Sequence, residues 1–176
     1  MIIIEGPDGA GKTTLLNELA AHYTSIPVHE RASDGVNGPV KNLYRWAERD
    51  VGNWTEEPVH FYDRHPFISE YIYGPVVRGT MDPQFHTTHL RRYVARRALT
   101  IVCLPPLDIV KLAVSDERDM AGVTTHIDTI WHLYASLPAS WASSAGIVVY
   151  DWTRHNAADH IHPHINSHRT HWSVTR

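Results

Sequence analysis

The sequence predicts an α/β fold in which a parallel β-sheet is covered by helices on both faces. Short apolar runs that are typical of strands alternate with longer segments of helical spacing, and this alternation favours βαβ units. The first run leads directly into a glycine-rich turn and then into an amphipathic segment. At 176 residues the chain can bury a substantial core without disulfides. We therefore expect one domain, residues 1–176, built in three layers.

The strands are predicted from short apolar runs. Three consecutive isoleucines open the first run, as is typical of a strand buried on both faces. The fourth run contains the single cysteine, Cys103, which we expect to be a small core residue. The expected strands are Ile2–Glu5, roughly Ser25–Glu30, Val59–Asp63, Thr100–Leu104 and Gly146–Asp151.

The helices are predicted in the segments between these strands. In the first segment Leu15, Leu16, Leu19 and Ala20 recur at helical spacing. Ligands of such folds bind beyond the carboxyl ends of the strands, so functional residues are expected just after each strand. The expected helices are Lys12–Tyr23, Pro39–Val51, Pro66–Arg78, Pro83–Ala98, Leu107–Val114 and Gly122–Ser136.

The turn after the first strand matches the phosphate-binding pattern G-x-x-x-x-G-K-[ST]. Its glycines let the backbone curl so that successive N–H groups point at phosphate oxygens. Lys12 is expected to reach the β- and γ-phosphates of ATP, and Thr13 to offer its hydroxyl to Mg²⁺. The helix that follows adds its positive N-terminal end. The alternative is a glycine turn without a ligand. The expected nucleotide-binding residues in this turn are Gly6, Asp8, Gly9, Ala10, Gly11, Lys12, Thr13 and Thr14.

An acidic residue and an arginine end the third predicted strand. Asp63 is expected to orient the water shell of Mg²⁺, and the Arg64 guanidinium to hold a phosphate with two hydrogen bonds. The alternative is an ion pair that closes the strand end, although buried pairs are a weak source of stability.

The end of the second predicted strand separates two chemistries. Arg31 is suited to hold the phosphate of a nucleoside monophosphate, whose kinase needs arginines but no strong base. Glu30 is suited to accept a proton from the hydroxyl of a nucleoside, whose kinase needs a positioned carboxylate. A solvated charged loop is the third interpretation.

Two helical segments carry candidate acceptor-binding residues. Tyr44 or Trp46 is expected to stack on a base while Arg45 reads the edge of that base, although such aromatic residues are more often part of a core. Ser69, Tyr73 and Arg78 follow the Asp63–Arg64 pair at a spacing that allows some of these side chains to face the acceptor.

A short charged segment, residues 112–122, is predicted to be a lid. Its Arg118 is expected to close over the transferring phosphoryl group and exclude water. The alternative is an ordinary charged connection between two helices.

Composition limits the remaining classes of function. The absence of a cysteine framework, a signal peptide and a long apolar run predicts a cytoplasmic protein without a membrane partner. A net charge of −3 predicts no duplex nucleic acid as a partner. The many histidines near the C-terminus lack the partners of a dedicated metal site, and the chain beyond about Asn166 is expected to be loosely held. A homodimer remains open.

Taken together, residues 5–14, which read EGPDGAGKTT, and the Asp63–Arg64 pair resemble the thymidylate kinase family and its deoxynucleotide kinase relatives. The resemblance implies a five-stranded parallel sheet and Mg-ATP-dependent transfer of the γ-phosphoryl group to a deoxynucleoside monophosphate. It also implies roles for individual residues. Asp8 would face the acceptor sugar, Arg31 and Arg64 would hold the acceptor phosphate, Arg45 would frame the base, and Thr153 or its neighbours would lie near the adenine of ATP.

The chain departs from this family in its short length, its abbreviated lid and its His65–Pro66 sequence, where an aromatic residue is usual. We therefore expect a compact phage-type kinase that accepts dTMP and other deoxynucleotides, located in the host cytoplasm if a phage encodes it. The alternative is a deoxynucleoside kinase with Glu30 as its base. A module that binds ATP without transferring phosphate is a third possibility.

Overall fold

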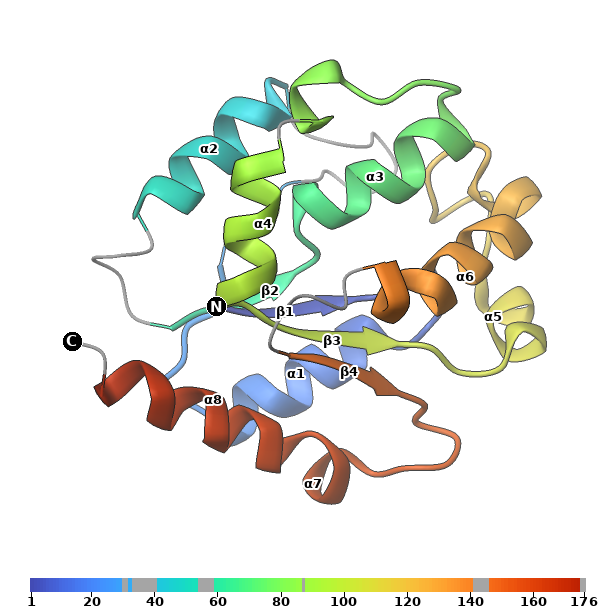
Figure 1. Cartoon of the computed structure of the whole chain (residues 1–176). Coiled ribbons are helices and arrows are strands. Elements are labelled where there is room, and N and C mark those ends of the chain that lie inside the picture. The colour runs from blue at the N-terminus through green and yellow to red at the C-terminus, as the bar shows by residue number, and fades with distance from the viewer. Residues whose placement is uncertain (30–31, 33–40, 54–58, 87, 141–145, 175–176) are drawn as a thin grey trace.

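The computed structural model describes residues 1–29, 32, 41–53, 59–86, 88–140 and 146–174 (Figure 1). Over these ranges the centre of the fold is a sheet of four parallel strands in the order β2-β1-β3-β4. The register pairs Ile2 of β1 with Phe61 of β2 on one side and Leu99 of β3 on the other. The strands are β1 (Ile2–Glu5), β2 (Phe61–Asp63), β3 (Leu99–Cys103) and β4 (Ile147–Tyr150).

The expected five-stranded sheet is wrong for the described residues, because the segment predicted as the second strand forms only one bridge. Val28 pairs with Phe61 in parallel, at the outer edge of β2. The Phe61 N–H donates to the Pro27 carbonyl at 2.9 Å, and the His29 N–H donates to the Phe61 carbonyl at 2.7 Å. Pro27 has no N–H and therefore cannot donate the next hydrogen bond toward the N-terminal end of this segment. Residues 30 and 31, the expected end of the strand, lie outside the described part.

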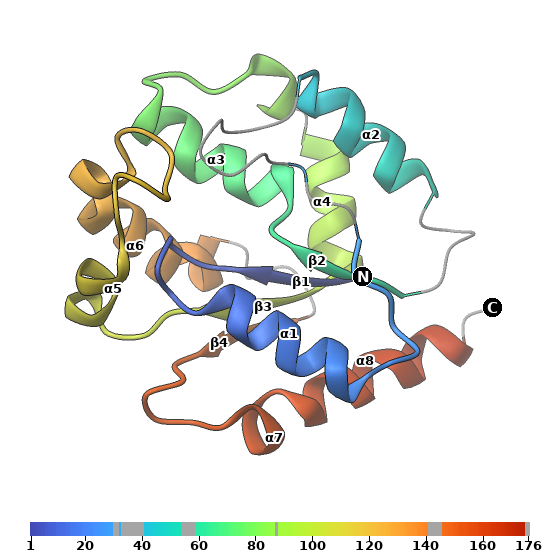
Figure 2. The ribbon, with the colours of Figure 1, turned by 180° about the vertical axis from the view of Figure 1, so that it is seen from behind.

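Helices cover both faces of the sheet, as predicted. Helices α1 and α8 lie on one side, and α2, α3, α4 and α6 lie on the other (Figures 1 and 2). The helices are α1 (Lys12–His22), α2 (Leu43–Asn53), α3 (Pro66–Val77), α4 (Thr88–Arg97), α5 (Leu107–Ala113), α6 (Val123–Ser140), α7 (Ala157–His160) and α8 (His162–Val174).

Two parts of the helical pattern differ from the sequence prediction. The expected helix at 83–98 is divided into a 3₁₀ turn, Pro83–His86, and α4. The chain after β4 was not assigned a helix, yet it forms α7 and α8, and α8 continues past Asn166 to Val174. A signal for these helices is present, because Ala157, Ile161 and Ile165 are buried at a spacing of four residues.

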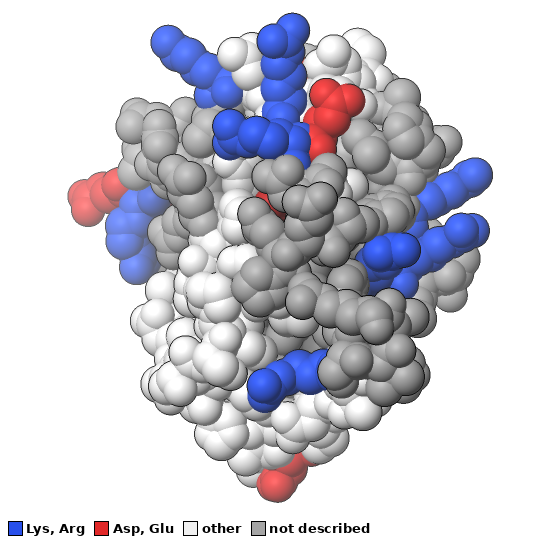
Figure 3. All heavy atoms as spheres, turned by 90° about the vertical axis from the view of Figure 1, so that its left-hand side faces the viewer, with Lys and Arg blue, Asp and Glu red and all other residues white. Residues whose placement is uncertain are grey.

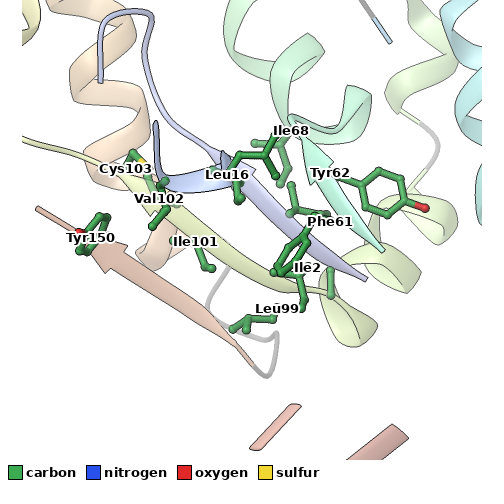
Figure 4. Packing of buried hydrophobic residues seen from close by; sticks show 14 of the residues in the cluster. Ile2, Leu16, Phe61, Tyr62, Ile68, Leu99, Ile101, Val102, Cys103 and Tyr150 are labelled. Atoms are coloured by element: carbon green, nitrogen blue, oxygen red, sulfur yellow. The ribbon is translucent and has the colours of Figure 1, made fainter. Parts of the chain in front are cut away.

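The core lies between the sheet and the helices that cover it (Figure 4). Phe61 of β2, Leu16 of α1 and Ile68 of α3 all belong to one buried cluster. Burial of such a side chain contributes roughly 1.5–3 kcal/mol. Cys103 is fully buried in β3, as its apolar run predicts. This packing fixes the carboxyl ends of β1, β2 and β3 beside one another.

The charged side chains on the surface bear on the exclusion of duplex nucleic acid. On the face in Figure 3 the described lysine and arginine side chains lie in separate groups with other residues between them. A continuous basic stripe is the usual footprint of duplex binding, and the exclusion of a duplex stays a prediction. Among the described residues no helix has the length and apolarity to cross a membrane.

Candidate active site at the carboxyl edge of the sheet

The turn between β1 and α1 has the backbone that a phosphate-binding loop requires. Gly6 has a φ of 139°, and a Cβ there would lie 2.3 Å from the carbonyl oxygen of Cys103. Gly11 has a φ of 85°, and a Cβ there would lie 2.9 Å from Nε1 of Trp152. Only glycine accepts both the left-handed conformation and the close contact. The motif therefore reflects the packing of the turn as well as its expected ligand.

A cavity of about 440 Å³ opens beside this turn, at the carboxyl ends of β1 and β2. It brings together most of the residues that the sequence predicts for the site. The predicted residues on its wall are Asp8, Gly9, Gly11, Lys12, Thr13, Thr14, Asp63, Arg64, Ser69, Tyr73 and Arg118.

Lys12 begins α1 and is almost completely buried beneath the turn. Its Nζ donates to the Pro7 carbonyl at 2.6 Å. Burial, followed by the nearby charge of Arg64, lowers the pKa of Lys12 to about 8, although Asp8 and Asp63 oppose this shift. A bound phosphate between Lys12 and Arg64 would relieve their repulsion, so the cavity is electrostatically suited to an anion.

Arg64 follows β2 in a left-handed conformation, with a φ of 70°, which is unusual for a residue with a side chain. Its Nη2 donates to Oδ1 of Asp8 at 2.7 Å, and its Nη1 donates to the Tyr134 hydroxyl at 2.9 Å. The guanidinium carbon also lies 4.9 Å from the centre of the Tyr73 ring. These contacts hold the guanidinium in the cavity wall.

Asp8 joins the phosphate-binding turn to α3. Its Oδ2 accepts from the Tyr73 hydroxyl at 2.8 Å, while Oδ1 accepts from Arg64. Burial opposes ionisation, but the charges of Arg64 and Lys12 and these hydrogen bonds outweigh it and lower the pKa of Asp8 to about 2. Asp8 is therefore an anion at neutral pH and a poor proton acceptor.

A second carboxylate, Glu5, lies beside Arg64, with its Oε2 3.7 Å from Nη1, and the sequence motifs predict no role for it. It is fully buried at the end of β1. Its Oε2 accepts from the Tyr134 hydroxyl at 2.8 Å, and its Oε1 accepts from the His65 N–H at 2.7 Å and the Ser69 hydroxyl at 3.1 Å. Burial raises the pKa of Glu5, although Arg64 and these hydrogen bonds oppose the shift. The sequence contained one signal for this role, because Glu5 is a charged residue at the end of a strand whose other residues are apolar.

Two further cavity residues lie on α3 and at its C-terminal cap, and of these the sequence spacing indicated Arg78 but not Glu70. Glu70 and Arg78 both line the cavity and form an ion pair through Oε2 and Nη2. They are 8 residues apart, which is about two helical turns, but the sequence does not show which face of the helix meets the cavity. Nothing local marks Tyr134 of α6, which is 70 residues from Arg64.

The segment predicted as a lid forms a turn between α5 and α6. The N–H of Ser115 donates to Oδ2 of Asp119 at 2.7 Å, which closes the turn. Arg118 is exposed, and its Nη2 donates to the Ala113 carbonyl at 2.6 Å. Both Arg118 and Asp119 reach the cavity wall. The turn thus adds a third cation to the cavity that Lys12 and Arg64 line.

Several predicted residues lie elsewhere in the described part. Tyr44 packs edge-on against Phe67 and Phe85, and Arg45 is exposed on α2; neither is part of the cavity wall. Thr153 donates to Oδ1 of Asp151 through its N–H and hydroxyl, at 2.9 and 2.6 Å.

Thr153 nevertheless follows Trp152, whose Nε1 donates to the Ala10 carbonyl at 3.1 Å, so it lies near the phosphate-binding turn. Gly6 and Ala10 belong to the turn without lining the cavity. Glu30 and Arg31 lie outside the described residues.

The oxygen ligands of the site fit Mg²⁺ only in part. The Thr13 hydroxyl and the Asp63 carboxylate line the same cavity, and Mg²⁺ prefers such ligands. Across the ranges that the structure covers, no group of three or more His, Cys, Asp or Glu side chains is arranged to hold a metal. The residues therefore fit an ion held mainly by phosphate oxygens and water, as is usual for Mg²⁺ in nucleotide sites.

Comparisons with solved structures extend over nearly the whole chain. The YorR protein from Bacillus subtilis, solved in complex with phosphorylated GDP, aligns with a TM-score of 0.61 and 19% identity over 94% of this chain and 92% of that chain. Deoxyadenosine kinase from M. mycoides with the products dCMP and dCDP aligns with a TM-score of 0.53 and 12% identity over 94% and 96%. The same kinase with dATP aligns with a TM-score of 0.51 and 13% identity over 94% and 97%.

The shared feature is the fold. Identities this low establish the arrangement of the chain and nothing about its substrate. No protein-family model matches the sequence, and no curated protein matches it. None of the three structures compared above is named a thymidylate kinase, so the narrower resemblance to that family stays a prediction.

Proposed function

We propose that this protein is a kinase that transfers the γ-phosphoryl group of Mg-ATP to a deoxynucleoside monophosphate. The observation that carries the proposal is a pair of cations that line one cavity: Lys12, buried at the start of α1, and Arg64, partly buried directly after β2. Each of them offers one phosphate-binding group. A donor and an acceptor phosphate would meet between them.

The donor side is the β1–α1 turn. Its backbone N–H groups and Lys12 would hold the β- and γ-phosphates, and Thr13 and Asp63 would hold Mg²⁺ and its water shell. Bound Mg²⁺ supplies charge neutralisation across the donor phosphates. Thr153, beside the turn, would lie near the adenine.

The acceptor side is built from Arg64, Asp8 and Tyr73. Arg64 would hold the acceptor phosphate and Asp8 the deoxyribose, since Asp8 is ionised and already fixed by two donors. Transfer then depends on alignment and electrostatic stabilisation, because the acceptor phosphate is already ionised and needs no strong base. Arg118 would neutralise charge from the lid side and exclude water.

A deoxynucleoside kinase is the second candidate, favoured by the deoxyadenosine kinase fold that the chain shares. That reaction needs a general base for the nucleoside hydroxyl. Asp8 is unsuited to this role because its pKa is low. Glu30 is the proposed base for this alternative.

The test is a panel of deoxynucleosides and deoxynucleoside monophosphates with Mg-ATP. The expected result is turnover of monophosphates. Lys12→Ala should lower kcat at least 10³-fold, because Lys12 is proposed to hold the transferring phosphate. The matched control Lys111→Ala should change kcat little, because Lys111 is an exposed lysine paired with Asp128. Turnover of nucleosides alone, reduced strongly by Glu30→Gln, would establish the second candidate instead. Tight ATP binding that no acceptor converts into turnover would exclude both kinases.

A further inference from the structure

A histidine caps α3 directly beside Arg64. The ring nitrogen Nδ1 of His65 accepts from the Phe67 N–H at 3.3 Å, in the first turn of the helix. The His65 N–H donates to Oε1 of Glu5 at 2.7 Å, and the His65 carbonyl accepts from the Ser69 N–H at 3.0 Å. The residue that follows Arg64 is therefore also the residue that starts α3.

Histidine can cap a helix in this way in only one of its states. Serine, threonine, asparagine and aspartate are the usual caps, and each offers an oxygen that accepts hydrogen bonds. A neutral imidazole accepts at Nδ1 only when its proton is on Nε2, and a charged imidazole does not accept at all. The contact with the Phe67 N–H therefore requires the tautomer of His65 that has its proton on Nε2.

A carboxylate lies opposite that proton. Asp50 belongs to α2, which packs against α3 on the same face of the sheet (Figure 1), and its Oδ2 lies 3.5 Å from Nε2 of His65. Asp50 is buried, and its Oδ1 accepts from the Tyr62 hydroxyl at 3.1 Å and lies 3.0 Å from Nε2 of His29. Burial opposes ionisation of Asp50, but polar contacts with His29 and His65 outweigh burial and lower its pKa. The resulting anion favours a proton on the nitrogen of His65 that faces it.

Packing holds the ring of His65 in this orientation. The residue is fully buried, and its ring stacks on Phe67 with 5.7 Å between centroids and an interplanar angle of 16°. The rings of Tyr62 and Trp46 lie at 5.9 and 6.4 Å from it. Because the ring is enclosed on several sides, the choice between its tautomers depends on the groups at its two nitrogens, the Phe67 N–H and the Asp50 carboxylate.

We propose that Asp50 and His65 are positioning residues for the acceptor. Asp50 fixes the tautomer of His65, and His65 in that tautomer caps α3 and holds Arg64 in place. The inference rests on the proposed function, because it takes Arg64 as the group that binds the acceptor phosphate. The effect falls mainly on the acceptor side, since His65 adjoins Arg64 whereas Lys12 belongs to α1.

The first measurement is NMR of the imidazole nitrogens in the full-length protein, with isotope-labelled histidine. The His65 signal is the one that His65→Asn removes, and in the wild type we expect its proton on Nε2. A wild-type ring that is charged, or protonated on Nδ1, would overturn the inference whatever the activity. This result does not depend on the folding of any Asp50 variant.

The same signal is then followed in Asp50→Asn. The variant keeps one oxygen, and the contacts with Tyr62 and His29 favour that oxygen at the Oδ1 position. The amide NH₂ group then faces Nε2 of His65, where a donor favours the opposite tautomer. A proton on Nδ1 opposes the Phe67 N–H, so we expect the cap to be lost. An unchanged tautomer would show that Asp50 does not set it.

Calorimetry measures Kd for Mg-ATP and for the deoxynucleoside monophosphate that the acceptor panel turns over fastest. Asp50→Asn should raise the Kd of the monophosphate about fivefold, the size of a lost helix cap, and that of Mg-ATP about twofold or less. The matched control is Glu48→Gln, which removes an exposed carboxylate from the same helix and should change neither value.

A double-variant cycle separates positioning from structural damage. Asparagine is a favoured cap that needs no carboxylate behind it, so His65→Asn keeps the cap and removes the contact with Asp50. In that background Asp50→Asn should change the Kd of the monophosphate about twofold or less. An equal loss in both backgrounds, or an equal loss for the monophosphate and Mg-ATP, would overturn the inference and leave the kinase intact. A wild type that binds no monophosphate would reject the proposed function and the acceptor role together, while NMR still decides whether Asp50 sets the tautomer of His65.

Discussion

Replacing Tyr134 with phenylalanine removes one hydroxyl group from the centre of the site and leaves the ring in place. That hydroxyl donates to Glu5 at 2.8 Å and accepts from Arg64 at 2.9 Å, and the residue is fully buried. Each hydrogen bond to a charged partner contributes about 1.5–3 kcal/mol. Glu5 keeps its bonds from His65 and Ser69, and Arg64 keeps Asp8, so part of the loss is compensated. We expect Tyr134→Phe to lower the free energy of unfolding by about 3 kcal/mol.

The assay is equilibrium unfolding in urea. With a slope of about 2 kcal/mol per molar urea, the midpoint should fall by about 1.5 M while the slope stays unchanged. Tyr23→Phe is the matched control, because the Tyr23 hydroxyl has only long contacts, 3.3 Å to Asn166 and 3.5 Å to the His162 carbonyl. Its loss should cost about 0.5–1 kcal/mol.

The comparison also has a functional readout. Because Arg64 loses one of its two hydrogen-bonding supports in Tyr134→Phe, the KM for the acceptor should rise more than the KM for ATP. If the two tyrosine variants shift the urea midpoint equally, the buried network does not hold Arg64 and the assignment of Glu5 as its support is wrong.

Three further outcomes follow from the site. Burial lowers the pKa of Lys12 to about 8, and a bound phosphate favours the charged form of this lysine, so nucleotide binding at pH 8 should take up about half a proton. At pH 6 Lys12 is already charged, and the terminal phosphate of the nucleotide, whose pKa is about 6, should instead release protons on binding. Calorimetry in buffers of different ionisation enthalpy measures this exchange, and equal uptake at both pH values would contradict it. Burial raises the pKa of the Cys103 thiol to about 12, so the native protein should react with a thiol reagent at least 100-fold more slowly than the protein in urea. Equal rates for the native and unfolded protein would show that Cys103 is accessible in the fold. Gly11→Ala forces a side chain into a left-handed conformation against Trp152 and should lower the free energy of unfolding by about 2 kcal/mol. If the double variant with Trp152→Ala recovers part of that loss, that part comes from the contact with Trp152. If the single variant loses no stability, the backbone at Gly11 is not strained by a side chain.

Much of the sheet could be predicted from the sequence, because buried parallel strands are short apolar runs. The three isoleucines of β1 and the apolar run around Cys103 were placed correctly to within a residue. In the described part of the segment predicted as the second strand, 25–29, Val28 alone pairs with β2. Strand pairing requires a partner with free hydrogen-bonding groups in register, and composition carries no information about that partner.

The candidate site, like the sheet, has parts that the sequence predicts and parts that it does not. The phosphate-binding turn is encoded in consecutive residues, since its conformation needs glycine at fixed positions and its charge comes from Lys12 within the same turn. Asp63 and Arg64 were found because strand ends in a parallel sheet share one edge. Tyr44 was a reasonable candidate by composition, but its ring packs against Phe67 and Phe85 instead.

What the sequence alone determined is thus the turn proposed to bind the donor, where neighbours in the chain are also neighbours in space. Tertiary structure decided which buried groups support the residues proposed to bind the acceptor. Glu5 is 129 residues from the tyrosine that donates to it, and Arg64 is 56 residues from Asp8. A buried charge is tolerated only when partners surround it, and those partners come from whichever elements the core brings alongside. Local spacing cannot identify them, because the packing of β1, β2, α3 and α6 creates the contact.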